Sequence, residues 1–317
     1  MFHRFTKCAR RRYTRLMMRT SAVFILLFVF LSRLKPAFFA LGSLGKTSSP
    51  TLESAVYLSA KSYGVRPLEP GQKGKCWFHS QQPHEQDKVI FKRLGGEVGE
   101  CSSAPVQDQA KLAYSEAQLC ACKAPPASAF ESHFLEIGAN DGQYLSNSLF
   151  FEMQLRWTGL CIEGSPSTFE QLRINRPKCA NFNALVGPIS QARTFYTFIS
   201  PASWETGVSC MKGTACAKSD KDAQQYAAEN NLQLRTDEVQ VIRLSDAFSM
   251  VALSKFSWLS IDVEGAEDIV VPTIDFTAIE ADYISIEGTH LLARDYLLAN
   301  GYRADFTVGP DTFFTPT

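Results

Sequence analysis

The sequence predicts an α/β protein whose largely parallel sheet is covered by helices on both faces. From Ser132 onward, short apolar runs alternate with longer segments of helical pattern, as in a sheet buried on both sides. The first run, Phe134–Ile137, leads into a glycine turn, and several later runs end in an acidic residue. Sheets of this class bind ligands at the carboxyl ends of their strands, so we expect the functional site there.

The expected strands are apolar or β-branched runs bounded by turn residues. They cover Phe134–Ile137, Thr158–Glu163, Phe182–Val186, Thr194–Ile199, Val239–Arg243, Trp258–Val263, Tyr283–Glu287, Arg303–Val308 and Thr312–Thr315. The expected helices cover Ser146–Glu152, Pro166–Arg173, Asp220–Asn230, Leu244–Val251, Ala266–Val271 and Thr289–Asn300.

Charge is unevenly distributed along the 317 residues, although the formal net charge is zero. The segment before Glu53 holds ten Lys and Arg and no acid, which leaves 22 basic against 32 acidic residues in the remainder. Phosphate contacts need clustered Lys and Arg, so an acidic body argues against nucleic acid as a partner. Neutral or cationic partners are favoured.

The N-terminus has the pattern of a type II signal anchor over residues 1–43. Seven basic residues within positions 1–20 precede the uninterrupted apolar run Ala22–Leu31, and such a flank keeps the N-terminus in the cytosol. We therefore expect a single-pass membrane protein of the secretory pathway, in the Golgi or the endoplasmic reticulum, with a luminal body. Cleavage near Ala40-Leu41-Gly42 and an Arg-rich mitochondrial transit peptide are the alternatives.

Residues 44–126 are rich in Gly and Pro and predict a stem followed by a loop-rich extension. Short helices are possible around Leu52–Tyr63 and Val106–Leu119. The regular pattern then defines a third part, residues 127–317.

Eight of the nine cysteines follow the anchor, an even number that allows disulfides in an oxidising compartment. Cys76, Cys101, Cys120 and Cys122 fall together in the extension, and Cys210 with Cys216 could close a small loop. Cys161 lies within an apolar run, which favours a buried free thiol.

The turn Gly138–Gly142 predicts a place where the backbone passes close to a ligand. Asn140 stands where a dinucleotide-binding motif needs its middle glycine, so NAD is not favoured. Glu163 follows Gly142 by 21 residues, the interval at which an acid after the second strand meets ribose hydroxyls. Glu163 could instead only begin the turn that caps the next helix.

Acids end four of the expected strands, at Glu136, Glu163, Asp262 and Glu287. Carboxylates are rare within core runs unless they are paired or functional. We expect them to surround one cleft.

Three motifs in order, together with the C-terminal pattern, resemble the FkbM-type family of S-adenosylmethionine-dependent methyltransferases. The motifs are Phe-Leu-Glu-Ile-Gly-Ala-Asn-Asp-Gly-Gln-Tyr from Phe134, Trp-Thr-Gly-Leu-Cys-Ile-Glu-Gly-Ser-Pro from Trp157 with Asn175-Arg176-Pro177 behind it, and Ser-Ile-Asp-Val-Glu-Gly-Ala-Glu from Ser260. The resemblance covers roughly residues 130–317.

The resemblance implies a class I methyltransferase (Rossmann-like) fold, with a seven-stranded sheet whose last strand is antiparallel, and commonly O-methylation with S-adenosylmethionine as cofactor. Glu163 would bind the ribose, and Asn183 and Ala184 would border the adenine. The methionyl part would lie over Glu136, Gly138, Ala139, Asn140 and Gly142. Glu136 departs from the family, where Asp is frequent at that position.

Methyl transfer to a hydroxyl needs alignment and a base for the released proton. Asp262 is the leading candidate base, Glu264 lies on the same side of the strand, and His290 is an alternative. These carboxylates could instead bind Mg²⁺ or Ca²⁺, although no metal is expected because no His or Asn is fixed beside them. The polar segment Ser200–Asp237 is expected to cover the cleft.

Two functions remain open from the sequence. The first is an O-methyltransferase that acts on a glycan or another small hydroxylated acceptor, and the second is a catalytically silent protein with a binding or trafficking role in the secretory pathway. Intact Glu163, Asp262 and glycine turn favour catalysis, and no motif identifies the acceptor.

Overall fold

The fold is that of a computed structural model, which describes residues 64–80, 84–103, 118–200, 205–214 and 216–317. The expected anchor, residues 1–43, and the possible helix Leu52–Tyr63 lie outside these ranges. Within the described residues, no helix is both long and apolar enough to span a membrane.

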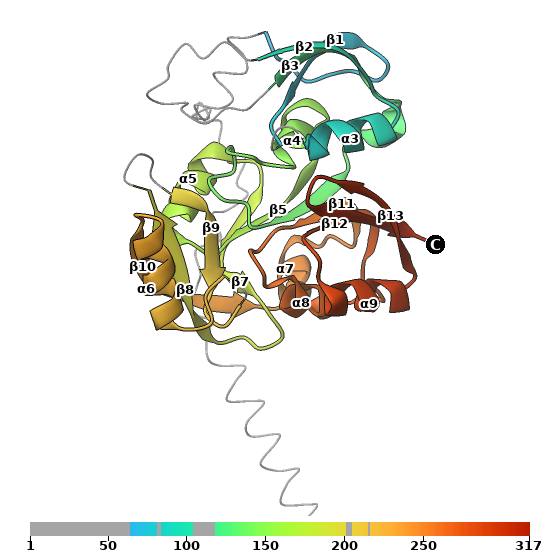
Figure 1. The fold of residues 1–317 in the computed structure, drawn as a ribbon. Helices are drawn as coiled ribbons and strands as arrows, with labels where there is room; N and C mark the ends of the chain where they lie inside the picture. The colour runs from blue at the N-terminus through green and yellow to red at the C-terminus, as the bar shows by residue number, and fades with distance from the viewer. Residues whose placement is uncertain (1–63, 81–83, 104–117, 201–204, 215) are drawn as a thin grey trace, which may run out of the picture. The chain divides into compact units, whose positions relative to one another are not determined.

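The central sheet has seven strands in the order β13-β14-β12-β11-β4-β5-β6 (Figure 1). Strands β4, β5, β6, β11 and β12 run parallel to one another, whereas β14 is antiparallel to both β12 and β13. Their bounds are β4 His133–Ile137, β5 Thr158–Glu163, β6 Ala180–Asn183, β11 Lys255–Ile261, β12 Glu280–Glu287, β13 Tyr302–Val308 and β14 Asp311–Pro316. The predicted α/β fold and its mostly parallel seven-stranded sheet are confirmed.

Alternating residues of each central strand face two different hydrophobic cores, as the two-residue period of a strand requires. In β4, Leu135 and Ile137 pack with α7, α8 and α9, whereas Phe134 packs on the opposite face with α4 and α5. These helices are α4 Leu149–Gln154, α5 Pro166–Asn175, α7 Leu244–Val251, α8 Glu267–Val270 and α9 Leu291–Ala299, with short 3₁₀ turns at Ala127–Ala129 and Val271–Thr273. The sheet is therefore buried on both sides.

The extension is more regular than its Gly and Pro content predicted. Strands β1 Lys73–Phe78, β2 Glu97–Ser103 and β3 Gln118–Lys123 form an antiparallel sheet in the order β1-β3-β2, joined by helix α3 Gln86–Arg93. Disulfides Cys76–Cys122 and Cys101–Cys120 cross-link this sheet. The expected helix Val106–Leu119 is wrong at its end, because Gln118 and Leu119 belong to β3; its other residues, 106–117, are not described.

The extension shares a hydrophobic core with the central sheet. Phe78 and Phe91 pack against Phe150 of α4, with ring centroids 4.5 Å and 5.2 Å apart. All three rings are buried, and α3 and α4 lie next to each other in Figure 1. Burial of several aromatic side chains stabilises this contact by several kcal/mol, on the order of 2 per ring, so the described part of the extension is a constituent of the fold.

A second sheet of four strands, in the order β7-β10-β8-β9, lies beside the central one (Figure 1). Its strands are β7 Leu185–Val186, β8 Ala192–Ile199, β9 Glu205–Met211 and β10 Gln233–Ile242, and helix α6 Asp220–Glu229 precedes β10. The strands expected at Thr194–Ile199 and Val239–Arg243 therefore belong to this sheet. The Cys210–Cys216 disulfide is present.

The prediction of a free thiol at Cys161 is wrong, because Cys161 forms a disulfide with Cys179. Cys161 lies at the centre of β5, and Cys179 lies in the connection from α5 to β6. Sequence indicated burial correctly, since both side chains are buried, but the pairing depends on how α5 returns the chain to the sheet.

Candidate functional site

A cavity of about 470 Å³ opens at the carboxyl ends of the central strands. Its walls contain five carboxylates that end or directly follow β4, β5, β11 and β12, namely Glu136, Glu163, Asp262, Glu264 and Glu287. The expectation that the strand-end acids surround one cleft is confirmed. Among the described residues that line this cavity there is no Lys, Arg or His.

The glycine turn forms one wall of the cavity through Gly138, Ala139 and Asn140. Gly138 has a φ of 83° and Asn140 a φ of 50°, both in the left-handed region. The amides of Gly138 and Ala139 donate to the carbonyl oxygen of Ile162, at 2.9 and 3.1 Å. Gly142 does not line the cavity. A Cβ at this position would lie 2.4 Å from Cγ of Arg176, so glycine is needed here for close packing against Arg176.

Glu163 links the turn to the next strand. Its Oε2 accepts from the Asn140 amide at 2.8 Å, and its Oε1 accepts from the Ser165 amide at 2.7 Å. The carboxylate therefore begins the turn before α5 and also faces the cavity, so its structural and ligand-binding roles are compatible. Asn183 does not line the cavity, since its Nδ2 donates to the backbone oxygen of Glu163 at 2.9 Å, whereas Ala184 does line it.

Glu136 is part of a buried ion-pair network. Arg176 approaches Glu136 at 3.2 Å and Glu152 at 2.9 Å, and all three side chains are at least 95% buried. Glu136 also accepts from the Asn147 amide at 2.8 Å and from the Ser148 hydroxyl at 2.6 Å. The carboxylate of Glu136 thus fixes the segment that follows the glycine turn. These hydrogen bonds and ion pairs also fix the position from which Glu136 could contact a ligand.

Sequence reasoning did not assign a role to Arg176 or Glu152. Arg176 lies within the Asn-Arg-Pro motif and directly follows α5. This position in the motif is the sequence feature from which a role for Arg176 could have been inferred. Glu152 is the acid of a mostly apolar helix, Leu149–Gln154, which is the pattern of a buried paired charge.

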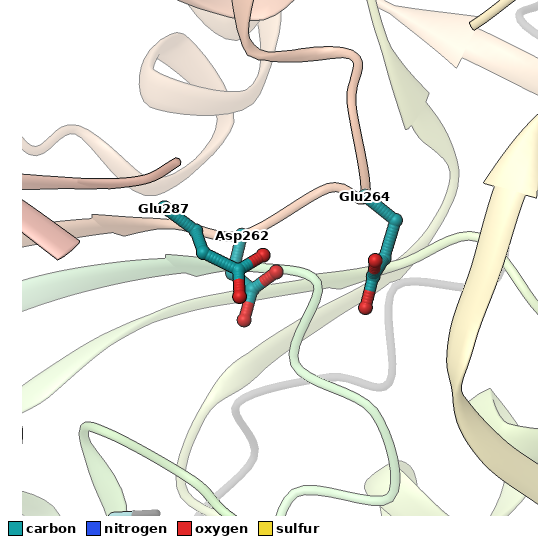
Figure 2. A group of neighbouring side chains, drawn as sticks. All are labelled: Asp262, Glu264 and Glu287. Carbon is teal, nitrogen blue, oxygen red and sulfur yellow. The ribbon is translucent and has the colours of Figure 1, made fainter. Parts of the chain in front are cut away.

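Asp262, Glu264 and Glu287 bring three carboxylates together next to the glycine turn (Figure 2). One oxygen of each lies within 4.8 Å of the others. Asp262 follows β11 and Glu287 ends β12, the parallel neighbour of β11. Glu264 lies in the turn after β11 with a φ of 54°, a conformation costly for a side-chain-bearing residue and frequent at functional sites. Glu287 is the member of this cluster that was not among the predicted site residues.

Burial and mutual repulsion raise the pKa values of this cluster. Burial is the largest cause for Asp262, whose pKa lies well above its usual range, and the charges of Glu287 and Glu264 add to it. Burial, followed by the charges of Glu287 and Glu267, raises the pKa of Glu264 to about 7. Asp262 and Glu287 hydrogen-bond through their side chains, which requires a proton on one of them.

Three clustered carboxylates are also a donor set that hard cations accept.

His290 lies outside the walls of the cavity. Its Nε2 is 3.0 Å from Oε2 of the buried Glu267, and its Nδ1 is 3.9 Å from Asp268. Glu267 also accepts from the Val263 amide at 2.9 Å. This pairing fixes the turn that carries Glu264, and it does not direct His290 toward the strand-end acids.

The second sheet supplies the remaining wall. Phe195 of β8 and Ser209 and Met211 of β9 line the cavity beside Leu185 and Val186. Two of these residues come from the segment Ser200–Asp237, which was expected to cover the cleft. The cavity is therefore acidic at β11 and β12 and apolar at β7, β8 and β9.

A comparison with known families identifies the domain to which the site belongs. The family described as Methyltransferase FkbM domain matches residues 136–304, just over half of the chain. No curated protein matches the chain. The match includes the glycine turn, Glu163 and the three clustered carboxylates, and it excludes the extension and β14.

Proposed function

The chain belongs to the FkbM methyltransferase family, and from that premise we propose that it is an S-adenosylmethionine-dependent O-methyltransferase. Its acceptor would be a hydroxyl of a glycan or of another small hydroxylated compound. One observation supports this most directly: a single cavity is lined both by a glycine turn and by three clustered carboxylates that lie next to it. Cofactor and proton acceptor would then meet in the same space.

The residues of the turn fit such a cofactor. A Cβ at Gly138 would lie 1.7 Å from the carbonyl oxygen of Asp262, so only glycine allows the turn and the acidic wall to approach so closely. Gly138, Ala139 and Asn140 would hold the methionyl part, and the Glu163 carboxylate would accept hydrogen bonds from the ribose hydroxyls. Ala184, Leu185 and Phe195 offer apolar surface suited to a flat base.

When bound, the cofactor supplies an electrophilic methyl group on a positively charged sulfur. The chain itself would orient the acceptor hydroxyl and take its proton. We assign the proton-accepting role to Asp262, because a carboxylate with a raised pKa is a better base near neutral pH than an ordinary one. Glu287 shares a hydrogen bond with Asp262 and would receive or stabilise that proton, while Glu264 would orient the acceptor.

The charge of the cavity favours a neutral or cationic acceptor. Five carboxylates and no basic side chain occur among the described residues that line it. A phosphate- or carboxylate-bearing acceptor would meet like charge at short range. Hydroxyl-rich compounds can donate hydrogen bonds to these carboxylates, which supports the glycan class.

A luminal location is also part of the proposal. Four disulfides occur within the described residues, and such bonds persist in oxidising compartments. Together with the basic flank and apolar run before residue 44, they favour a type II protein of the Golgi or endoplasmic reticulum over a mitochondrial one. Protease treatment of sealed microsomes should leave the C-terminal body intact, and its digestion without detergent would exclude a luminal body.

Calorimetry with the full-length chain tests the enzymatic function. We expect S-adenosylmethionine and S-adenosylhomocysteine to bind with dissociation constants in the micromolar range. In a separate assay with a panel of neutral sugars and polyols, we expect the labelled methyl group to be transferred to at least one member. If no binding is seen at about 1 mM cofactor, the binding free energy is weaker than roughly 4 kcal/mol. That result would exclude the methyltransferase and favour the catalytically silent alternative.

A further inference from the structure

The N-terminal extension reaches the strand beside the carboxylate cluster through one buried hydrogen bond. Nε2 of Gln86, the first residue of α3, donates to Oδ2 of Asp311 at 2.8 Å. Both residues are at least 95% buried, and they are 225 positions apart in the chain. Both lie outside the segment that matches the methyltransferase family.

Asp311 is the neighbour of the carboxylate cluster. It begins β14 and lies directly opposite Glu287 in the antiparallel pairing of β12 with β14. Its charge acts on both Glu287 and Asp262. The groups that face Asp311 are Glu287, His84 and Gln86, of which Gln86 donates a hydrogen bond to it.

We propose that Gln86 is a positioning residue of the methyl-transfer site, which keeps Asp311 ionised beside Glu287 and so adds negative charge next to the cluster of Asp262, Glu264 and Glu287. This inference rests on the proposed function, because the charge matters where the sulfonium of the cofactor would lie. The extension would then contribute to the electrostatics of the site, in addition to packing against α4.

The physical basis is the response of a buried carboxyl to its donors. Burial raises the pKa of Asp311 to about 6, and the Gln86 hydrogen bond opposes that rise. Loss of the donor would therefore favour the neutral acid near pH 7. Negative charge near a sulfonium strengthens binding of the charged cofactor but has little effect on its neutral thioether product.

Comparison of two ligands separates this effect from a general loss of structure. The full-length wild type, Gln86→Met and Asp311→Asn are titrated at pH 7 with S-adenosylmethionine and with S-adenosylhomocysteine. Methionine preserves the length of the Gln86 side chain without its donor, and asparagine preserves the shape of Asp311 without its charge. We expect both variants to lose about three- to tenfold in affinity for S-adenosylmethionine, with S-adenosylhomocysteine affinity unchanged within about twofold.

Gln225→Met is the matched control. Gln225 also donates through Nε2 to a carboxylate at 2.8 Å, that of Glu229, but on the exposed surface of α6. Its affinities for both ligands should equal those of the wild type. In the double variant Gln86→Met with Asp311→Asn, the loss should equal that of Asp311→Asn alone, because Gln86 acts through Asp311.

The outcomes are distinguishable. If Gln86→Met loses affinity equally for both ligands, Gln86 has a purely structural role and the inference is overturned. The inference is also overturned if neither variant changes the affinity for either ligand. In either case the proposed function stands if the wild type binds S-adenosylmethionine. Should Gln86→Met fail to fold, Asp311→Asn alone tests the inference, and an unchanged ratio of the two affinities in that variant overturns it. A wild type that binds neither ligand refutes the function and this inference together.

Discussion

The backbone of Gly138 lies against the backbone of Asp262, so close that a Cβ at position 138 would be 1.7 Å from the Asp262 carbonyl oxygen. The Asp262 amide also donates to the carbonyl oxygen of Ile137 at 3.1 Å. The glycine turn after β4 and the acid after β11 are therefore one structural unit. Displacement of either wall would displace the other.

Gly138→Ala should abolish cofactor binding. The new methyl group cannot occupy the Asp262 backbone, so the turn must move, in addition to a cost of about 1 kcal/mol for a positive φ. Calorimetry should show at least a hundredfold loss of S-adenosylmethionine affinity, about 2.7 kcal/mol. Gly301→Ala is the control, because Gly301 has a similar φ of 85° and open space around it. Wild-type affinity in Gly138→Ala would contradict the close approach.

Asp262→Asn should eliminate methyl transfer while S-adenosylhomocysteine still binds. Asparagine retains the shape but cannot accept the hydroxyl proton, and loss of a general base costs about 10²- to 10⁴-fold in rate. The measurement is single-turnover transfer to the best acceptor of the panel, with the exposed Asp295→Asn as control. Unchanged turnover would remove Asp262 as the base and direct attention to Glu264.

Glu163→Gln should weaken both cofactor and product by about tenfold or more. The carboxylate accepts from the amides of Asn140 and Ser165 at once, and a glutamine has one acceptor oxygen for these two donors. One amide would then face an NH₂ group, and the turn would loosen. Titration of both ligands measures this, and Glu170→Gln, on the exposed face of α5, should bind both normally. A loss confined to one ligand would argue against a contact with the ribose that both share.

Arg176→Leu should destabilise the whole fold by about 3 to 5 kcal/mol, because it leaves Glu136 and Glu152 as buried charges without their cation. Urea unfolding followed by circular dichroism gives the free energy of unfolding. Arg173→Leu, three positions earlier and exposed, removes only a surface pair with Glu170 and should cost less than about 1 kcal/mol. Similar costs for both variants would mean that the buried network contributes nothing beyond a surface pair.

Glu264→Gln should stabilise the protein at pH 8 but not at pH 5. The folded-state pKa of Glu264 is raised to about 7, so the folded protein binds this proton more tightly than the unfolded chain does. Stability from this group is present at low pH and is lost as pH rises through about 7. Thermal unfolding at both pH values should show a gain of about 1 to 2 kcal/mol at pH 8 only. A gain of equal size at both would exclude titration of Glu264 as its cause.

The sequence by itself determined those features that local pattern encodes. Short apolar runs bounded by turn residues specified the strands of a sheet buried on both faces, and glycine with its permissive φ specified the turn at Gly138. Glu163 and Asp262 were identified as cavity acids because parallel strands deliver their carboxyl ends to one edge of a sheet. Each of these inferences depends only on residues that are close together in the sequence, and the structure agrees with them.

Only the tertiary structure decided which distant residues meet. Glu287 ends β12 and His290 follows it by three residues, yet Glu287 lines the cavity and His290 pairs with Glu267. Cys161 pairs with Cys179, and Gln86 meets Asp311 across 225 positions. Side-chain partners depend on the packing of helices and on connections between strands, and the same residue type in the same local pattern is compatible with several partners. Packing, rather than sequence period, selects among them.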